Sequence, residues 1–204
     1  MRRALPLPPL MVVTNRQMTA DLPATVEGAL QGGAKWVLLR EKDMTQPTRR
    51  ELARQLKALT DRHAAHLGVN SDVATARSVG AASLHLPAGP LPHRASAAEL
   101  LLGASAHDAR EAEDAVAAGV DYLLLAPIFA TESKPMHRPA LGLAGLRAIV
   151  EMVPIPVIAL GGITPERVAA CLEAGAAGIA AMGAIMRAPD PGSVVQEYLK
   201  AMSR

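Results

Sequence analysis

Residues 118–127 read AGVDYLLLAP, and this stretch indicates the fold of the chain. Gly119 follows a helical pattern and fits the left-handed position that commonly closes a helix. An unbroken apolar run, residues 122–127, begins shortly after it, which is typical of a strand covered on both faces of a parallel sheet. A helix end followed at once by such a strand is the second half of a β-α-β unit.

The same unit recurs along the chain. A Gly-Ala pair precedes a short apolar run at Gly33-Ala34, Gly80-Ala81 and Gly175-Ala176. Further short apolar runs lie between these units. Together they predict eight strands, at residues 10–15, 36–40, 66–70, 83–86, 101–106, 122–127, 156–160 and 178–183. Helical patterns lie between them, for example at residues 108–118, 143–152 and 165–174.

These elements predict an α/β chain that folds as a single (β/α)8 barrel of the TIM type. A length of 204 residues is near the lower limit for eight such units. We expect residues 1–9 to be an extended lead-in and residues 10–204 to form the barrel. An open doubly wound sheet would require a glycine-rich turn after the first strand, and the sequence VVTNR at residues 12–16 has none.

Composition argues against several classes of partner. The net charge is only +2 and the basic residues are scattered, so nucleic-acid binding is not expected. The single cysteine, Cys171, cannot form an internal disulfide, which favours a reducing, cytoplasmic location. No apolar run is long enough to span a membrane. A homodimer is compatible with the sequence, which leaves the oligomeric state open.

Polar side chains follow the predicted strands repeatedly. Each has an ordinary explanation: a cation after a strand is usually solvated, Asn70 could cap a helix, and His85 could be a satisfied core histidine. Together they predict a site, because chemistry in such barrels sits at the carboxyl ends of the strands. Ser105 and His107 are two residues apart and therefore face the same side. The full set is Arg40, Lys42, Asn70, His85, Ser105, His107, Thr131 and Lys134.

The last two units carry a pattern that favours phosphate binding. Gly161 and Gly162 end the seventh strand, and Gly183 and Ala184 end the eighth. Backbone N–H groups at helix starts bind phosphate, and barrels often place phosphate at these two loops. The alternative is that the glycine pair only forms a tight turn.

From about Val12 to Ile185 the chain resembles the thiamine-phosphate synthases and their relatives, the thiazole tautomerases. The stretches that carry the resemblance are REK at 40–42, VN at 69–70, GASAH at 103–107, AGVDY at 118–122, PIFATESK at 127–134, LG at 141–142 and PIPVIALGGIT at 154–164.

The resemblance implies roles for these residues. In a synthase a pyrimidine diphosphate ionises, the nitrogen of a thiazole phosphate attacks the carbocation, and Mg²⁺ and basic groups stabilise the departing diphosphate. Ser105 matches a residue near the reacting pyrimidine, while Gly162 and the turn at Gly183-Ala184 match the thiazole-phosphate site. Those that match the diphosphate cradle are Arg40, Lys42, Asn70, Thr131 and Lys134.

The chain departs from the synthase pattern at its metal ligands. Ser71 stands where the pattern has an aspartate, and LPAGP at residues 86–90 replaces a stretch that contains a second one. Mg²⁺ prefers carboxylate oxygens, so we expect no metal site and no cofactor unless the chain is a synthase, which would need Mg²⁺. Asp72 and Asp43 are the nearest remaining carboxylates.

The LPAG stretch at residues 86–89 looks more like the tautomerase branch, so the leading expectation is a thiazole tautomerase. Such an isomerase binds a thiazole carboxylate phosphate and moves a proton by general acid/base catalysis. Pro127 replaces the histidine expected in that branch, which makes His107 the first candidate for the proton carrier, followed by His85 and His137. Two alternatives stay open: a Mg²⁺-dependent thiamine-phosphate synthase, and a catalytically silent regulatory binder of thiazole phosphate or thiamine phosphate.

Overall fold

The protein is described by a computed structural model that covers residues 3–91, 99–130 and 139–203. Eight parallel strands pair in chain order and close into a barrel, β8 against β1. The strands are β1 Leu10–Val13, β2 Trp36–Leu39, β3 His66–Asn70, β4 Ser83–Leu86, β5 Leu101–Ala106, β6 Tyr122–Leu125, β7 Val157–Leu160 and β8 Gly178–Ala181. The predicted (β/α)8 barrel is confirmed, although four of the strands end two residues or less before their predicted limits.

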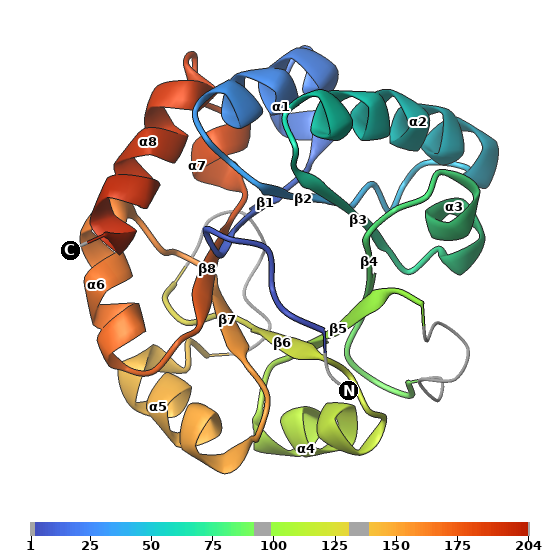
Figure 1. Cartoon of the computed structure of the whole chain (residues 1–204). Coiled ribbons are helices and arrows are strands. Elements are labelled where there is room, and N and C mark those ends of the chain that lie inside the picture. Colours follow the sequence, from blue (N-terminus) through green and yellow to red (C-terminus); the bar gives the residue numbers. More distant parts are fainter. Residues whose placement is uncertain (1–2, 92–98, 131–138, 204) are drawn as a thin grey trace.

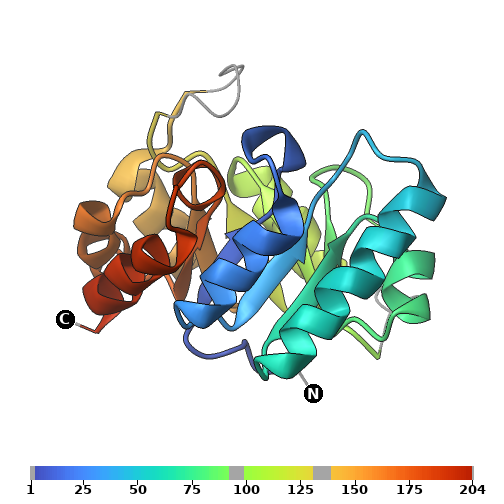
Figure 2. The same cartoon turned by 90° about the horizontal axis from the view of Figure 1, so that it is seen from above.

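The helices lie outside the ring of strands, as Figure 1 shows, and the side of the barrel formed by α1, α2 and α8 is visible in Figure 2. They are α1 Leu22–Gln31, α2 Gln46–Arg62, α3 Val73–Ser78, α4 Ala109–Ala117, α5 Gly142–Met152, α6 Pro165–Glu173, α7 Gly183–Met186 and α8 Pro191–Met202. A short 3-10 helix, η1, covers Arg16–Met18. None of the helices in the described part of the chain is long and apolar enough to cross a membrane.

The recurring glycines close helices in the predicted manner. Gly33, Gly80, Gly119 and Gly175 all have positive φ angles, between 64° and 106°. After each one, the next N–H group bonds back to the helix, for example Val120 N to the carbonyl of Ala115 at 3.4 Å. This arrangement satisfies carbonyl groups at the helix end and directs the chain into the next strand.

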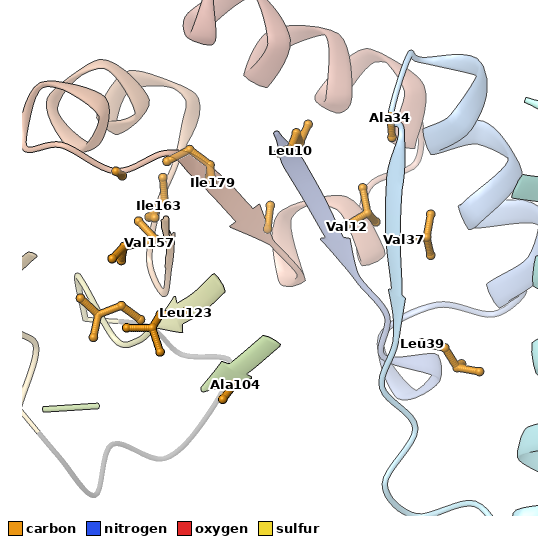
Figure 3. Close-up of a cluster of buried hydrophobic side chains, with 14 of the residues drawn as sticks. Leu10, Val12, Ala34, Val37, Leu39, Ala104, Leu123, Val157, Ile163 and Ile179 are labelled. Atoms are coloured by element: carbon orange, nitrogen blue, oxygen red, sulfur yellow. The ribbon is translucent and has the colours of Figure 1, made fainter. Parts of the chain in front are cut away.

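The core has two layers because side chains alternate along each strand. Leu10 and Val12 of β1 face the helices and pack in the outer layer with Val37 and Leu39 of β2 (Figure 3). Met11 and Val13 point into the barrel and pack with Trp36, Leu38, Tyr122 and Ile158. Side chains therefore fill the lower barrel, and space for a ligand remains only where the strands end.

The segment before β1 crosses one end of the ring of strands (Figure 1). Its Leu5 packs against the inner layer of the core, and the carbonyl of Pro9 accepts a hydrogen bond from Ile179 N at 2.9 Å. Residues 3–9 thus cover the amino end of the barrel, and the main pocket lies at the carboxyl ends of the strands.

Candidate functional site

The carboxyl ends of the strands surround a pocket of about 630 Å³. Most of the residues that the sequence predicted for the site line it: Arg40, Lys42, Asn70, His85, Ser105, His107, Gly161, Gly162, Gly183 and Ala184. Thr131, Lys134 and His137 lie outside the described residues. The strand register thus brings together side chains that are far apart in the sequence.

Two cations, Arg40 and Lys42, line the pocket after β2. Burial lowers the pKa of Arg40, with Glu41 opposing the shift. Burial also lowers the pKa of Lys42, and the neighbouring Arg40 lowers it further. Neither side chain has a hydrogen-bond or ion-pair partner in residues 3–91, 99–130 and 139–203. Two partly desolvated charges that repel each other without a partner form a site suited to a multiply charged anion.

No aspartate or glutamate is found among the pocket-lining residues within the described ranges. The nearby carboxylates have structural partners instead. Glu41 accepts from Thr14 Oγ1 at 2.7 Å and Arg16 N at 3.1 Å. Asp43 pairs with Arg16. Asp72 caps α3 by accepting from Thr75 N at 2.8 Å.

A second side of the pocket, formed by the loops after β7 and β8, has the geometry of a phosphate site. Gly161 and Gly162 have φ angles of 102° and 62°, a conformation that side chains rarely adopt. A Cβ atom on Gly162 would lie 2.3 Å from the carbonyl oxygen of Ala130, so the loop requires glycine for space as well. The adjacent N–H groups of Gly183 and Ala184 open α7, where helical N–H groups have no partner within the helix.

Two arginines at this side were missed by the sequence analysis. Arg167 and Arg187 both line the pocket. Arg167 donates to the carbonyl of Gly162 at 2.7 Å, and its guanidinium lies 4.6 Å from the centre of the Phe129 ring. Each arginine follows one of the glycine loops within a helical turn or two, and this spacing was the signal that could have identified them.

His85 of β4 and Ser105 of β5 both line the pocket. His85 is 1% exposed, its Nε2 lies 2.9 Å from Ser105 Oγ, and its Nδ1 lies 3.2 Å from Tyr122 Oη. Burial, assisted by Arg40 and Lys42, lowers the pKa of His85 to about 3. The His85 imidazole is therefore neutral at physiological pH and does not gain or lose a proton there.

His107 follows β5 directly and also lines the pocket. Its Nδ1 is 2.8 Å from Glu111 Oε2, and the same oxygen accepts from His107 N at 2.8 Å. Glu111 is in the first turn of α4, so the helix start fixes the position of the imidazole. This pairing orients the ring, and it does not by itself assign the ring a proton-transfer role.

Comparison with known proteins identifies a family. The family model described as thiamine monophosphate synthase matches residues 10–185. The thiamine-phosphate synthase of Chloroflexus aurantiacus is 42% identical over 170 residues, which are 82% of this chain and 79% of that protein. The thiamine-phosphate synthase of Moorella thermoacetica is 36% identical over 202 residues, 96% of each chain. A solved thiamine phosphate pyrophosphorylase from Pyrococcus furiosus superposes with a TM-score of 0.86 at 33% identity, over 95% of both chains.

These similarities contradict the leading expectation of a thiazole tautomerase and favour the synthase alternative. The expectation rested on the LPAG stretch and on missing metal ligands. Pro87 and Ala88 of that stretch belong to a loop at the pocket rim. A short loop and missing metal ligands are weak evidence for a tautomerase. The absence of carboxylates for a metal does not supply the acid/base group that a tautomerase needs.

Proposed function

The chain belongs to the thiamine monophosphate synthase family, and we propose that it is a transferase that joins a pyrimidine diphosphate to a thiazole phosphate. The observation that carries the proposal is a single pocket with cations at two separate sides. Arg40 and Lys42 lie after β2, and Arg167 and Arg187 lie beside the glycine loops. A reaction between two phosphorylated substrates requires such a pair of anion sites.

The diphosphate binds at Arg40 and Lys42 in this proposal. Both cations are partly buried, and within the described ranges neither side chain forms an ion pair, although Glu41 lies near enough to oppose part of the shift of Arg40. Charge-assisted hydrogen bonds to phosphate oxygens are stronger than neutral ones, and they strengthen further as the leaving group accumulates charge. Asn70 at the end of β3 contributes an amide on the same side.

The thiazole phosphate binds at the other side. Backbone N–H groups of the glycine loops hold the phosphate, and Arg167 and Arg187 complement its charge. This changes the sequence-based expectation, which assigned the binding to backbone groups alone.

The described residues do not fit a resident Mg²⁺ ion. A magnesium site normally uses one or two carboxylates, and the described pocket lining has none. Asp72, the nearest carboxylate to Ser71, is committed to Thr75 and Arg49. We therefore propose that protein cations, rather than carboxylate-bound metal, neutralise the diphosphate. Calorimetric titration of the free protein with Mg²⁺ tests this, and micromolar stoichiometric binding would contradict it.

The reaction follows from the two anchored phosphates. The C–O bond to diphosphate breaks and the diphosphate leaves with the electron pair, and the thiazole nitrogen then forms a C–N bond to the resulting carbocation at the methylene carbon of the pyrimidine. No proton is transferred in this step. Aliphatic side chains that include Val13, Leu38 and Leu124 line the same pocket, and in this proposal they exclude water from the electrophilic carbon.

Expression in a bacterial strain that lacks its own thiamine-phosphate synthase tests the proposal in cells. Growth without added thiamine is expected for the wild-type chain and not for Arg40→Met. Failure to grow, with folded protein present, would contradict the proposal and would favour the silent-binder alternative if the protein still bound thiazole phosphate.

A further inference from the structure

Tyr122 lies at the centre of the barrel and has no part in the reaction described above. Its side chain is fully buried and stands edge-on to Trp36, with the ring centres 5.0 Å apart. A Cβ atom on Gly103 of the neighbouring strand would lie 2.0 Å from Cζ of the Tyr122 ring. Glycine weakens a strand interior, so its presence at this position is explained by the space that the ring requires.

The hydroxyl of Tyr122 has one hydrogen-bond partner in the described part of the chain, Nδ1 of His85 at 3.2 Å. Burial raises the pKa of Tyr122, so the phenol keeps its proton. A buried donor without an acceptor is unfavourable, and His85 Nδ1 is the acceptor within reach. Tyr122 therefore donates and His85 Nδ1 accepts.

The proton of the neutral imidazole must then be on the other nitrogen, Nε2. Nε2 lies 2.9 Å from Ser105 Oγ and donates to it. In the reverse arrangement Ser105 would donate to Nε2, His85 Nδ1 would donate to Tyr122, and the phenol proton would have no acceptor. The first arrangement pairs the buried phenol and both imidazole nitrogens, and it leaves only the Ser105 hydroxyl proton for a partner in the pocket.

We propose that Tyr122 is a positioning residue that acts through His85 to make the Ser105 hydroxyl a hydrogen-bond donor to the molecule in the pocket. Ser105 uses an acceptor site on its oxygen for His85 and keeps its own proton for the ligand. The ligand must present an acceptor there; a pyrimidine ring nitrogen does so, whereas an exocyclic amine does not. The identity of this ligand rests on the proposed function, but the direction of the hydrogen bonds does not.

Long-range ¹H–¹⁵N NMR spectra of histidine-labelled protein test that direction, because they distinguish the two imidazole tautomers. We expect His85 to carry its proton on Nε2 in the wild type and in Ser105→Ala, and to become a mixture of tautomers in Tyr122→Phe. The matched control is Tyr198→Phe, which removes the only other tyrosine hydroxyl of the chain, a donor to Ile163 O at 2.7 Å, and leaves His85 unchanged. A wild-type proton on Nδ1, or no change in Tyr122→Phe, would overturn the proposal.

A double-mutant cycle tests the route through Ser105. Calorimetry should show that Tyr122→Phe weakens binding of the pyrimidine diphosphate about three- to tenfold, the effect of one hydrogen bond, and causes no further loss in Ser105→Ala. An equal loss in both backgrounds would mean that Tyr122 acts through packing, and would overturn the route. If the wild type does not bind this diphosphate, the proposed function fails, while the NMR spectra of the wild type and of Tyr122→Phe still decide the direction of the hydrogen bonds.

Discussion

The guanidinium of Arg49 holds the carboxylate of Asp72, with Nε and Nη2 at 3.2 and 3.1 Å from Oδ2. The same carboxylate caps α3 through Thr75 N, and both residues are largely buried. Asp72 thus joins α2 to α3 outside the pocket lining. This network explains why a carboxylate one residue away from the expected metal-ligand position does not line the pocket.

Replacing Asp72 with Asn should therefore reduce stability rather than catalysis. Asparagine retains the ability to cap the helix, but its single side-chain oxygen cannot replace both carboxylate oxygens, so the loss reports the charge together with the hydrogen bonds that Oδ2 accepts from Arg49 and Thr75. We expect about 1–3 kcal/mol for charged hydrogen bonds in a largely buried pair. Burial acts to raise the pKa of Asp72, but hydrogen bonds from Thr75, Gln46 and Arg49 outweigh it and hold the pKa below its usual value.

Because the pKa of Asp72 is lowered in the folded state, its contribution to stability depends on pH in a defined direction. A carboxyl with a lowered pKa in the folded state stabilises the protein above its ordinary pKa, and this contribution is lost as the pH falls through the folded value, below about pH 4. Urea unfolding should show a large difference between wild type and Asp72→Asn at pH 7 and a smaller one at pH 3. An equal difference at both pH values would contradict this account.

Arg40→Met and Lys42→Met should each weaken binding of inorganic diphosphate by about 10- to 100-fold, the effect of losing one charge-assisted interaction. Methionine keeps most of the aliphatic stem, so the change isolates the charge. Lys57→Met is the matched control, because Lys57 pairs with Asp61 on the outer helix α2. Unchanged affinity in both pocket variants, measured by calorimetry, would place the diphosphate elsewhere.

Ala184→Asp should weaken binding of thiazole phosphate at least about tenfold, because it introduces a negative charge at the phosphate side of the pocket. Ala184 is exposed and lines the pocket, so a longer side chain fits there without strain, unlike at Gly162. Ala184→Asn has nearly the same shape without the charge and should bind far more tightly than the aspartate variant. Equal affinities for the two variants would show that the phosphate does not lie at this loop.

His107→Asn should retain turnover within about threefold, since general acid/base groups normally contribute 10²–10⁴ and the proposed step transfers no proton. The measurement is kcat for thiamine phosphate formation at neutral pH. A loss of a hundredfold or more, with the fold intact, would show that His107 takes part in the chemistry.

The sequence was sufficient to predict the barrel and most of the pocket, because both depend on local and periodic features. Glycines such as Gly119 mark helix ends through their backbone conformation, and parallel strands bring their carboxyl ends together whatever their separation in the chain. Ser105 and His85 could therefore be assigned to one rim from strand ends alone.

Features that depend on side-chain direction could not be predicted in this way. The role of Tyr122 depends on which side of β6 faces His85, and the direction of the Arg167 side chain from α6 does not follow from the helical pattern. The prediction of the tautomerase branch was wrong for a related reason. Ser71 and the loop after β4 do not by themselves distinguish a tautomerase from a synthase, because that choice also depends on which other charged side chains line the pocket.

Incubation of the purified protein with the pyrimidine diphosphate and the thiazole phosphate tests the central claim most directly, with thiamine phosphate and diphosphate quantified together. The assay contains Mg²⁺ in one series and a chelator in another. We expect the two products to form in equal amounts, only when both substrates are present, and to form in both series. Absence of thiamine phosphate in both series, from protein shown to be folded, would contradict the assignment as a synthase.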